Sequence, residues 1–232
     1  EWKITKSLLL FSLPMILGNL LQQLYNVADT FIVGKYLGSE ALAAVGSSFT
    51  LMTFLTSIIL GLCMGSGILF SMLYGAKEID KMKVSFFVSF IGVGIISILL
   101  EGICIVAINP ILVFMNIPTD VYQITYDYLI IIFIGIFFTF IYNYFASLLR
   151  SLGNSKIPLI FLAIASIINI VLDIFFIVSL NMGVSGAALA TLIAQIFSAL
   201  GIMIYVLVFK KELLPQRQHY YFDKEIFKKI KD

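Results

Sequence analysis

Long apolar runs alternate with short polar segments along almost the whole chain. Six runs reach the length of about 20 residues that an α-helix needs to cross the hydrocarbon core of a bilayer. They cover residues 8–33, 45–74, 84–108, 122–149, 157–180 and 184–209. Because the connections are short, consecutive helices must pack as antiparallel neighbours. The pattern predicts an all-α polytopic membrane protein in which residues 1–209 form a six-transmembrane-helix bundle.

Composition and charge support this interpretation and add an orientation. The chain is 61% hydrophobic and 12% charged, whereas an ordinary soluble domain is about 45–50% apolar and about 25% charged. If the amino terminus is cytoplasmic, every Lys and Arg except Lys35 lies on the cytoplasmic side, which satisfies the positive-inside rule. We therefore expect both termini in the cytoplasm, with residues 210–232 as a basic linker in which His219 is solvated. The basic balance reflects topology and does not indicate a nucleic-acid partner.

Two acidic residues lie inside the predicted spans. A carboxylate in a membrane span costs at least a few kcal/mol, so Asp29 in the first span and Asp173 in the fifth are functional-site candidates by default. Tyr25 precedes Asp29 by one helical turn, and Asn169 precedes Asp173 by one turn. At a rise of 1.5 Å per residue, both acids and Thr191 of the sixth span lie about 10 Å below the outer surface.

These side chains form one polar site if the first, fifth and sixth spans line a common cavity. Burial favours the protonated form of a carboxyl group, whereas an approaching cation favours the ionised form, so that a proton and a cation compete for the same group. Two carboxylates with amide and hydroxyl oxygens also suit a hard monovalent cation. The plain alternative is that Asp29 and Asp173 only satisfy each other or neighbouring backbone groups.

Other polar positions in the spans are weaker candidates. Tyr128 and Asn143 on the fourth span are candidate cavity-lining residues. Pro14 removes a backbone hydrogen bond from the first helix and is a candidate hinge. Glu101 and Asp127 lie near enough to the outer surface for a wet interfacial position to explain them.

Known signatures of enzymes are missing from the sequence. We find no His-Glu-x-x-His, Gly-x-Ser-x-Gly, Gly-x-x-x-x-Gly-Lys-Ser/Thr or Cys-x-x-Cys, so hydrolysis, nucleotide use and thiol chemistry lack their usual groups. We therefore expect a protein that is not an enzyme. It needs no cofactor and no metal beyond a coupling H⁺ or Na⁺ at the polar site.

Four sequence motifs in a fixed order carry a resemblance to a known family. They are Gln22-Gln-Leu-Tyr-Asn-Val-Ala-Asp-Thr-Phe-Ile-Val-Gly34, which runs on to Ala41-Leu-Ala-Ala-Val-Gly46; Leu149-Arg-Ser-Leu-Gly-Asn-Ser-Lys-Ile-Pro158; Asn169 through Asp173; and Gly183-Val-Ser-Gly-Ala-Ala-Leu-Ala-Thr191. This set resembles the amino-terminal half of multidrug and toxic compound extrusion (MATE) transporters. The resemblance covers essentially the whole chain.

The resemblance implies a twelve-helix exporter of two six-helix lobes, which drives amphipathic, often cationic drugs outward in exchange for protons or sodium. It also implies a cation-coupling site in the amino-terminal lobe, and its roles fall on Asp29, Asn169, Asp173 and Thr191. Two alternatives remain: a flippase for lipid-linked precursors of the same superfamily, and a membrane scaffold that transports nothing.

The length of the chain departs from this family, because MATE transporters are about twice as long. We therefore expect one lobe or a fragment, whose cavity is completed by a second six-helix lobe or by a second copy of the chain. The other expected partners are the lipid bilayer and small organic substrates. Richness in Ile, Phe, Lys and Asn suggests an AT-rich bacterial genome. We therefore expect a multi-pass protein of the inner (cytoplasmic) membrane of a bacterium.

Overall fold

The computed structural model describes residues 2–219, and within this range every regular element is a helix. The all-α fold class is therefore confirmed, whereas the part of the predicted linker after His219 lies outside the described residues. The elements are α1 (Trp2–Gly75), α2 (Ile79–Val106), α3 (Ile108–Phe114), α4 (Thr119–Ile134), α5 (Ile136–Ser151), α6 (Lys156–Asp173), the π-helix η1 (Ile174–Ser179), α7 (Gly183–Phe209) and two 3₁₀ turns, η2 (Lys211–Leu213) and η3 (Arg217–His219).

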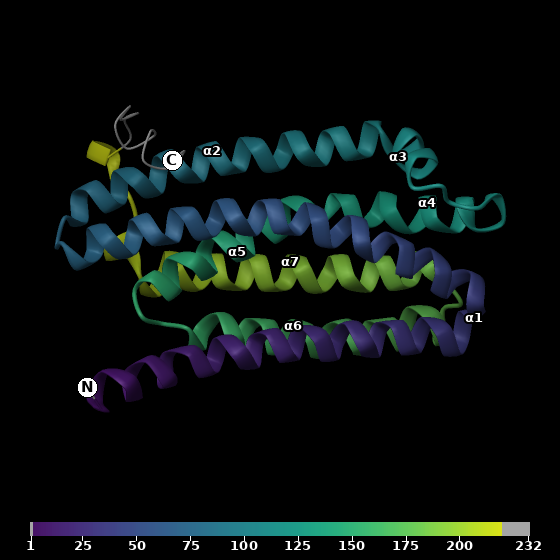
Figure 1. Cartoon of the computed structure of the whole chain (residues 1–232), viewed down its shortest axis with the longest axis horizontal. Coiled ribbons are helices and arrows are strands. Elements are labelled where there is room, and N and C mark those ends of the chain that lie inside the picture. Colours follow the sequence, from purple (N-terminus) through teal and green to yellow (C-terminus); the bar gives the residue numbers. More distant parts are fainter. Residues whose placement is uncertain (1, 220–232) are drawn as a thin grey trace.

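The first helix turns back on itself without a loop. The sequence suggests a connection between the runs 8–33 and 45–74, but α1 is helical throughout except at Gly38, whose φ of 86° and ψ of −172° are not helical. Only glycine adopts this combination readily, because it has no Cβ. The chain therefore reverses at this residue and forms two apolar arms that run in opposite directions (Figure 1).

The fourth predicted span, 122–149, is broken near its middle. α4 and α5 meet at Gly135 with a bend of 41°. The two arms of α1, then α2, α4 with α5, α6 with η1, and α7 follow the order of the six predicted spans. α2, α6 with η1 and α7 are each long and apolar enough to cross a bilayer, and so is the bent α4–α5 pair taken as one span. The number of crossings itself stays a prediction.

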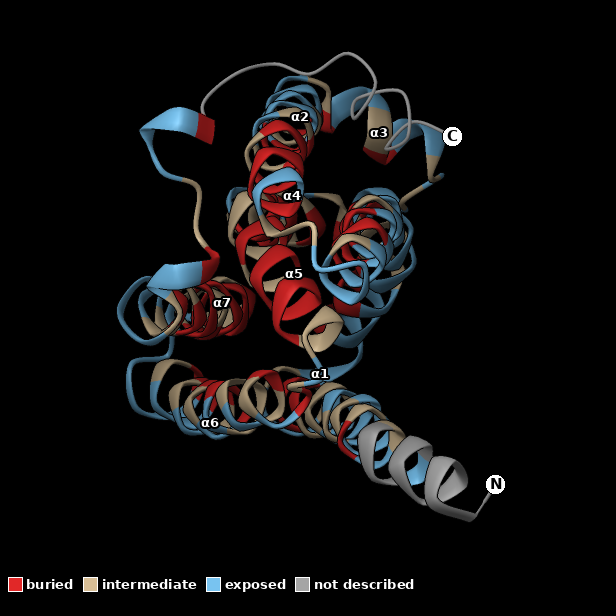
Figure 2. Cartoon of the chain, turned by 90° about the vertical axis from the view of Figure 1, so that its left-hand side faces the viewer, coloured by how far each residue is buried: buried red, intermediate tan, exposed pale blue. Residues whose placement is uncertain are grey.

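α5 runs through the middle of the bundle and is the most completely buried helix (Figure 2). Its centre lies in a cluster of aromatic rings whose centroids are 5.2–6.1 Å apart. The Tyr144 hydroxyl donates to the Phe86 carbonyl at 2.8 Å and contacts Ser89 Oγ at 2.6 Å, which links α5 to α2. The cluster consists of Phe70, Phe86, Phe90, Phe140, Tyr144 and Phe145.

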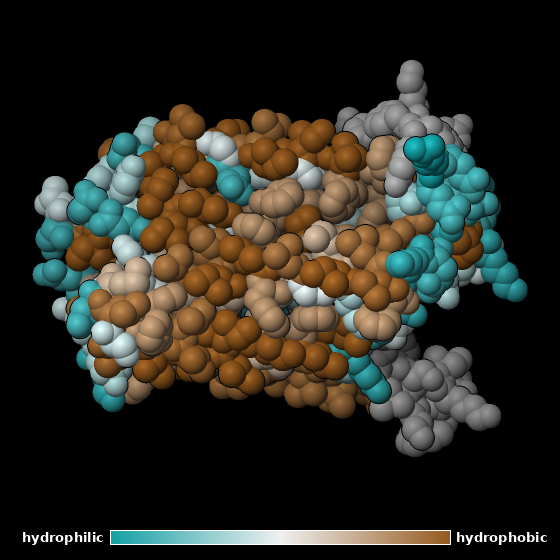
Figure 3. All heavy atoms as spheres, turned by 180° about the vertical axis from the view of Figure 1, so that it is seen from behind, coloured by the Kyte–Doolittle hydropathy of each residue, from teal (hydrophilic) through white to brown (hydrophobic). Residues whose placement is uncertain are grey.

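The outer surface is apolar around the middle of the bundle and polar at its two ends. Figure 3 shows this distribution on one face, and more than forty large hydrophobic side chains are exposed, including Leu24, Phe31, Phe54 and Leu99. A soluble protein rarely exposes a continuous apolar surface of this size. Such a belt is what a bilayer requires, so the molecule is a membrane helical bundle.

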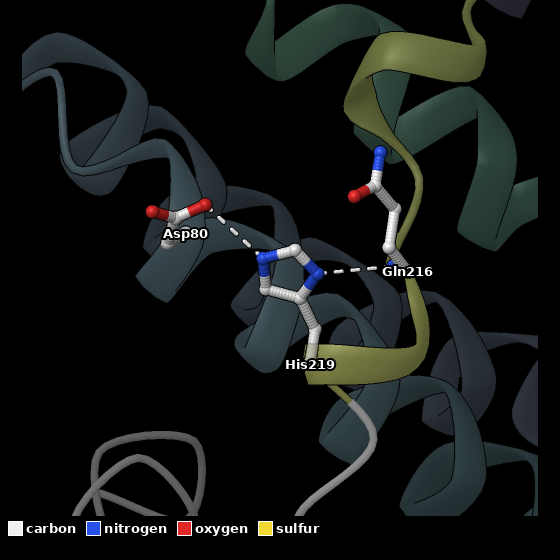
Figure 4. A network of polar contacts seen from close by, with 3 residues as sticks. All are labelled: Asp80, Gln216 and His219. Carbon is white, nitrogen blue, oxygen red and sulfur yellow. Dashed lines mark hydrogen bonds and ion pairs between the residues drawn. The ribbon is translucent and has the colours of Figure 1, made fainter.

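The segment after α7 folds back over the end of α2. His219 is 3% exposed, and its Nε2 lies 3.1 Å from Asp80 Oδ1, while the Gln216 N–H donates to its Nδ1 at 3.0 Å (Figure 4). Because Nδ1 accepts, the neutral ring carries its hydrogen on Nε2 and donates it to Asp80. The expectation of a solvated His219 is therefore wrong, because the segment after α7 turns back and packs His219 against the end of α2.

Candidate functional site

The four residues predicted to form the polar site come from three helices and are all buried. Asp29 lies on the first arm of α1 and is 7% exposed, and Asp173, the last residue of α6, is 0% exposed. Asn169 lies one turn earlier on α6, and Thr191 lies on α7. Asp29 precedes the reversal at Gly38 by nine residues, which places it about 13 Å from that end of the bundle.

Asn169 connects Asp173 with Thr191. Its side-chain amide lies 3.2 Å from Thr191 Oγ1. The amide orientation that suits every neighbour has the nitrogen donating to Asp173 Oδ2 at 3.3 Å and the oxygen accepting from the Thr191 N–H at 3.2 Å. Asn169 therefore orients the Asp173 carboxyl group and joins α6 to α7 at the same level.

The carboxyl groups of Asp29 and Asp173 lie close enough to each other to interact. Two neighbouring carboxylates repel each other when both are ionised, and a proton or a cation bound at the pair lowers that repulsion. The Oδ1 atom of each residue is buried and has no hydrogen-bond partner within the described chain. No N–H or O–H donor of the described residues therefore serves these two oxygens, and the plain alternative that the acids serve each other stays a prediction beside that of a cation site.

The weaker candidates divide into two groups. The hydroxyls of Tyr25 on α1 and Tyr128 on α4 lie close enough for the charges of Asp29 and Asp173 to act on them, and the Tyr128 side chain is buried. In the described part of the chain, no hydrogen bond links Asn143 on α5 to Asp29 or Asp173. Its amide donates instead to the Thr139 carbonyl of its own helix at 2.8 Å.

Pro14 lies inside α1, where the backbone remains helical around it. The structure therefore shows a buried proline within a continuous helix and no break at this point. A hinge at Pro14 stays a prediction, because a single conformation does not report a bending motion.

Two features near the site were not evident from the sequence. Directly after Asp173 the helix changes to the π-helix η1, whose wider turn ends the regular winding of α6 at the acidic residue itself. Gln195 on α7 points its Oε1 at Gly135 on the break between α4 and α5. Neither feature can be recognised in the sequence from the order of apolar and polar residues. Gly135, between Ile134 and Ile136, is only a weak signal of a helix break.

The chemistry of the site follows from the atoms that its side chains offer to an ion. Carboxyl, amide and hydroxyl oxygens bind protons and hard cations, whereas soft metals prefer sulfur and imidazole. Within residues 2–219, no group of three His, Cys, Asp or Glu side chains is placed to hold a metal ion. The oxygen atoms of the site are of the type that binds protons and hard cations.

Comparison with known proteins places the chain in a family. The chain matches the MatE family over residues 14–175, which is well over half of its length. It belongs to this family of membrane transporters.

Curated relatives extend the similarity to nearly the whole chain. The chain is 35% identical over 222 residues to the probable multidrug resistance protein YpnP of Bacillus subtilis, with 93% of this chain and 48% of the relative covered. It is 30% identical over 209 residues to the multidrug export protein MepA of Staphylococcus aureus, with 87% and 45% covered. The chain thus spans about half the length of the curated relatives it matches and corresponds to their amino-terminal half.

Solved structures share the fold. An outward-facing multidrug resistance MATE family transporter of the MOP superfamily superimposes with a TM-score of 0.90 at 27% identity, covering 97% of this chain and 50% of that protein. A MOP superfamily transporter from Pyrococcus furiosus, whose binding pocket is described as reversed in polarity, gives 0.90 at 28% identity with the same coverage.

Proposed function

We propose that this chain is one lobe of a cation-coupled antiporter that exports amphipathic, often cationic compounds. The observation that carries the proposal is the pair of buried, interacting carboxyl groups of Asp29 and Asp173, each with an oxygen that no donor of the described residues serves. Intramembrane acids of this kind belong to ion and proton pathways as a rule. The names of the relatives, multidrug resistance and export proteins, support drugs as cargo.

The coupling ion occupies the space between the two acids and leaves it in exchange for cargo. With a proton bound, one acid donates to the other and the pair carries a single negative charge. With Na⁺ bound, both acids are ionised and their oxygens coordinate the ion, together with the Asn169 or Thr191 oxygen. Either occupant lowers the repulsion between Asp29 and Asp173, and its departure restores that repulsion, so that occupancy changes the packing of α1 against α6.

A complete cavity needs more than this lobe. Because the curated relatives are about twice as long, we propose that a second six-helix lobe, or a second copy of the chain, faces the site and completes the path for cargo. The bacterial relatives and the apolar belt support the cytoplasmic membrane of a bacterium as the location.

The test is Asp173→Asn in the natural-length protein, reconstituted into liposomes that contain a fluorescent cationic dye. An imposed pH gradient and an imposed Na⁺ gradient are applied separately, and dye movement is recorded. We expect the substitution to abolish gradient-driven movement, because an amide neither binds a proton nor supplies a charged ligand. Asp29→Asn should act in the same way.

Asp127→Asn is the matched control, since this acid lies on α4 and its carboxylate accepts only from exposed Gln123 at 2.7 Å in the described chain. It should leave dye movement unchanged. Gradient-driven movement that survives in both Asp173→Asn and Asp29→Asn would rule out the proposed coupling, and the scaffold alternative predicts no movement even in the unaltered protein.

A further inference from the structure

Glu101 is a further intramembrane acid, and the proposed exchange does not use it. It lies on α2 on the same side of the helix as buried Ser97 and Cys104, four residues before and three after it. Its Oε2 accepts the backbone N–H of Phe137 at 3.0 Å. The carboxylate thus reaches across the bundle to the backbone of α5, which differs from the free interfacial position expected from the sequence.

Phe137 stands in the first turn of α5, directly after the 41° bend at Gly135. In an uninterrupted α-helix its N–H would donate to the Phe133 carbonyl. A helix that begins inside a bilayer has N–H groups that no water can reach, so each needs a partner from the protein. A carboxylate is a favourable one because it also interacts with the positive end of the helix dipole. Glu101 therefore stabilises the bent arrangement relative to the straight one.

Gln195 contacts the same break from another helix. Its Oε1 is buried, has no hydrogen-bond partner within residues 2–219, and lies so close to Gly135 that an added Cβ there would overlap it. The side chain from α7 fills the space that the missing side chain of Gly135 leaves. Two independent contacts, from α2 and from α7, thus hold one bend.

Tyr128 lies on α4, about two turns before the bend, and the buried residues of α5 lie after the bend. Because Tyr128 lies within reach of the Asp29–Asp173 charges, the angle between α4 and α5 sets where its ring lies. We infer that Glu101 and Gln195 are positioning residues, which hold the α4–α5 bend and thereby place Tyr128 beside the acidic pair. Only this last link to cation coupling rests on the proposed function.

A distance measurement tests the bend without any transport. The natural-length protein has Cys63 and Cys104 changed to Ala. It carries one spin label at Thr119, the first residue of α4, and one at Ser151, the last residue of α5, which are the ends farthest from the bend. Each of these helices has 16 residues, about 24 Å, so loss of a 41° bend moves the labels apart by about 3 Å. We expect Glu101→Leu to produce a shift of this size, because the freed N–H then pairs within a straightened helix.

Glu101→Gln separates positioning from a general loss of stability. Its amide oxygen accepts the same N–H, so the label distance should stay at the unaltered value. Asp127→Asn, which removes an acid on α4 itself, should also leave it unchanged. Gly135→Ala should move the labels, because its Cβ overlaps the Gln195 oxygen, and the added change Gln195→Ala should restore them, because the new Cβ then fills the space that this oxygen occupied. An unchanged distance in Glu101→Leu, or an equal shift in Glu101→Gln, would overturn the inference.

Dye efflux then tests the link to the acidic pair. Glu101→Leu should raise the concentration of driving cation needed for half-maximal efflux severalfold, and Glu101→Gln should restore it. If Asp173→Asn leaves efflux intact, the proposed coupling fails, while the label distances still decide the role of Glu101 in the bend. If Asp173→Asn abolishes efflux but Glu101→Leu alters neither distance nor cation dependence, the inference alone fails.

Discussion

Tyr144 illustrates how few polar groups hold the interior of this bundle together. Its ring is fully buried among aromatic side chains, and its hydroxyl reaches both Ser89 and the Phe86 carbonyl. In surroundings without water, such a hydroxyl has no alternative partner, so the two contacts fix the distance between α5 and α2. Single polar residues therefore determine the spacing of helices whose other contacts are apolar and less directional.

Replacing Tyr144 by Phe should lower the free energy of unfolding by about 1 kcal/mol, because the Phe86 carbonyl and the Ser89 hydroxyl lose a partner while ring packing is kept. Thermal unfolding in detergent micelles measures this loss. Tyr122→Phe removes an exposed hydroxyl that donates to Asn109 Oδ1 at 2.9 Å and should change stability by less than about 0.5 kcal/mol. Equal losses in both variants would contradict the role given to burial.

The acidic site could be predicted from the sequence, but the contacts of Glu101 could not. Asp29, Asn169 and Asp173 stand out because polar residues interrupt apolar runs, and helical rise places the two acids at a common depth. Glu101 bonds a backbone group, which every residue carries, so its partner Phe137 has no distinguishing side chain. The sequence therefore indicates which groups are unusual, and only the structure shows what each one contacts.

At the scale of elements, the two breaks at glycine have different physical causes. Gly38 adopts a φ of 86° with nothing within 4 Å of an added Cβ, so the backbone alone requires glycine there. Gly135 has a φ of −76°, which any residue adopts, and glycine is required there by its close neighbour Gln195. Apolar length predicts how many residues are helical, but it does not show where a helix turns. Gly135 lies within a run that remains apolar, whereas Gly38 lies in the more polar segment between two runs, which is helical on both sides of it.

Gly38→Ala should destabilise the protein by about 1–3 kcal/mol, because an alanine is strained in this backbone conformation whatever space surrounds it. Gly61→Ala is the matched control: Gly61 also has nothing within 4 Å, but it lies in a regular part of α1. There alanine should be neutral or stabilise by up to about 1 kcal/mol. Unfolding in detergent distinguishes the two, and similar results for both would show that Gly38 is not strained.

At the scale of the whole molecule, both ends of the described chain lie at the same end of the bundle, with the segment after α7 tied to α2 (Figure 1). Besides the His219 contacts, Leu213 of this segment is buried against the core. The tie therefore closes one end of the bundle with contacts from residues that are distant in sequence.

His219→Ala should release this segment without unfolding the helices. The loss of its two hydrogen bonds corresponds to about 1 kcal/mol, so backbone amides of residues 211–219 should exchange with deuterium several times faster, up to about tenfold. Gln218→Ala, which changes the exposed neighbouring side chain, should leave exchange unaltered. Protection that persists in His219→Ala would assign the tie to Leu213 alone.

The reversal at Gly38 also limits how the topology of this protein can be mapped. Reporter tags and protease sites are tolerated where a flexible turn is exposed, and the first two arms of the bundle offer none, since α1 stays helical on both sides of one residue. An inserted epitope there would separate two arms that now meet directly. The turns at Asn116 and Asn181, both with a φ of 52°, are the places on that side of the bundle where a tag can be inserted without cutting a helix.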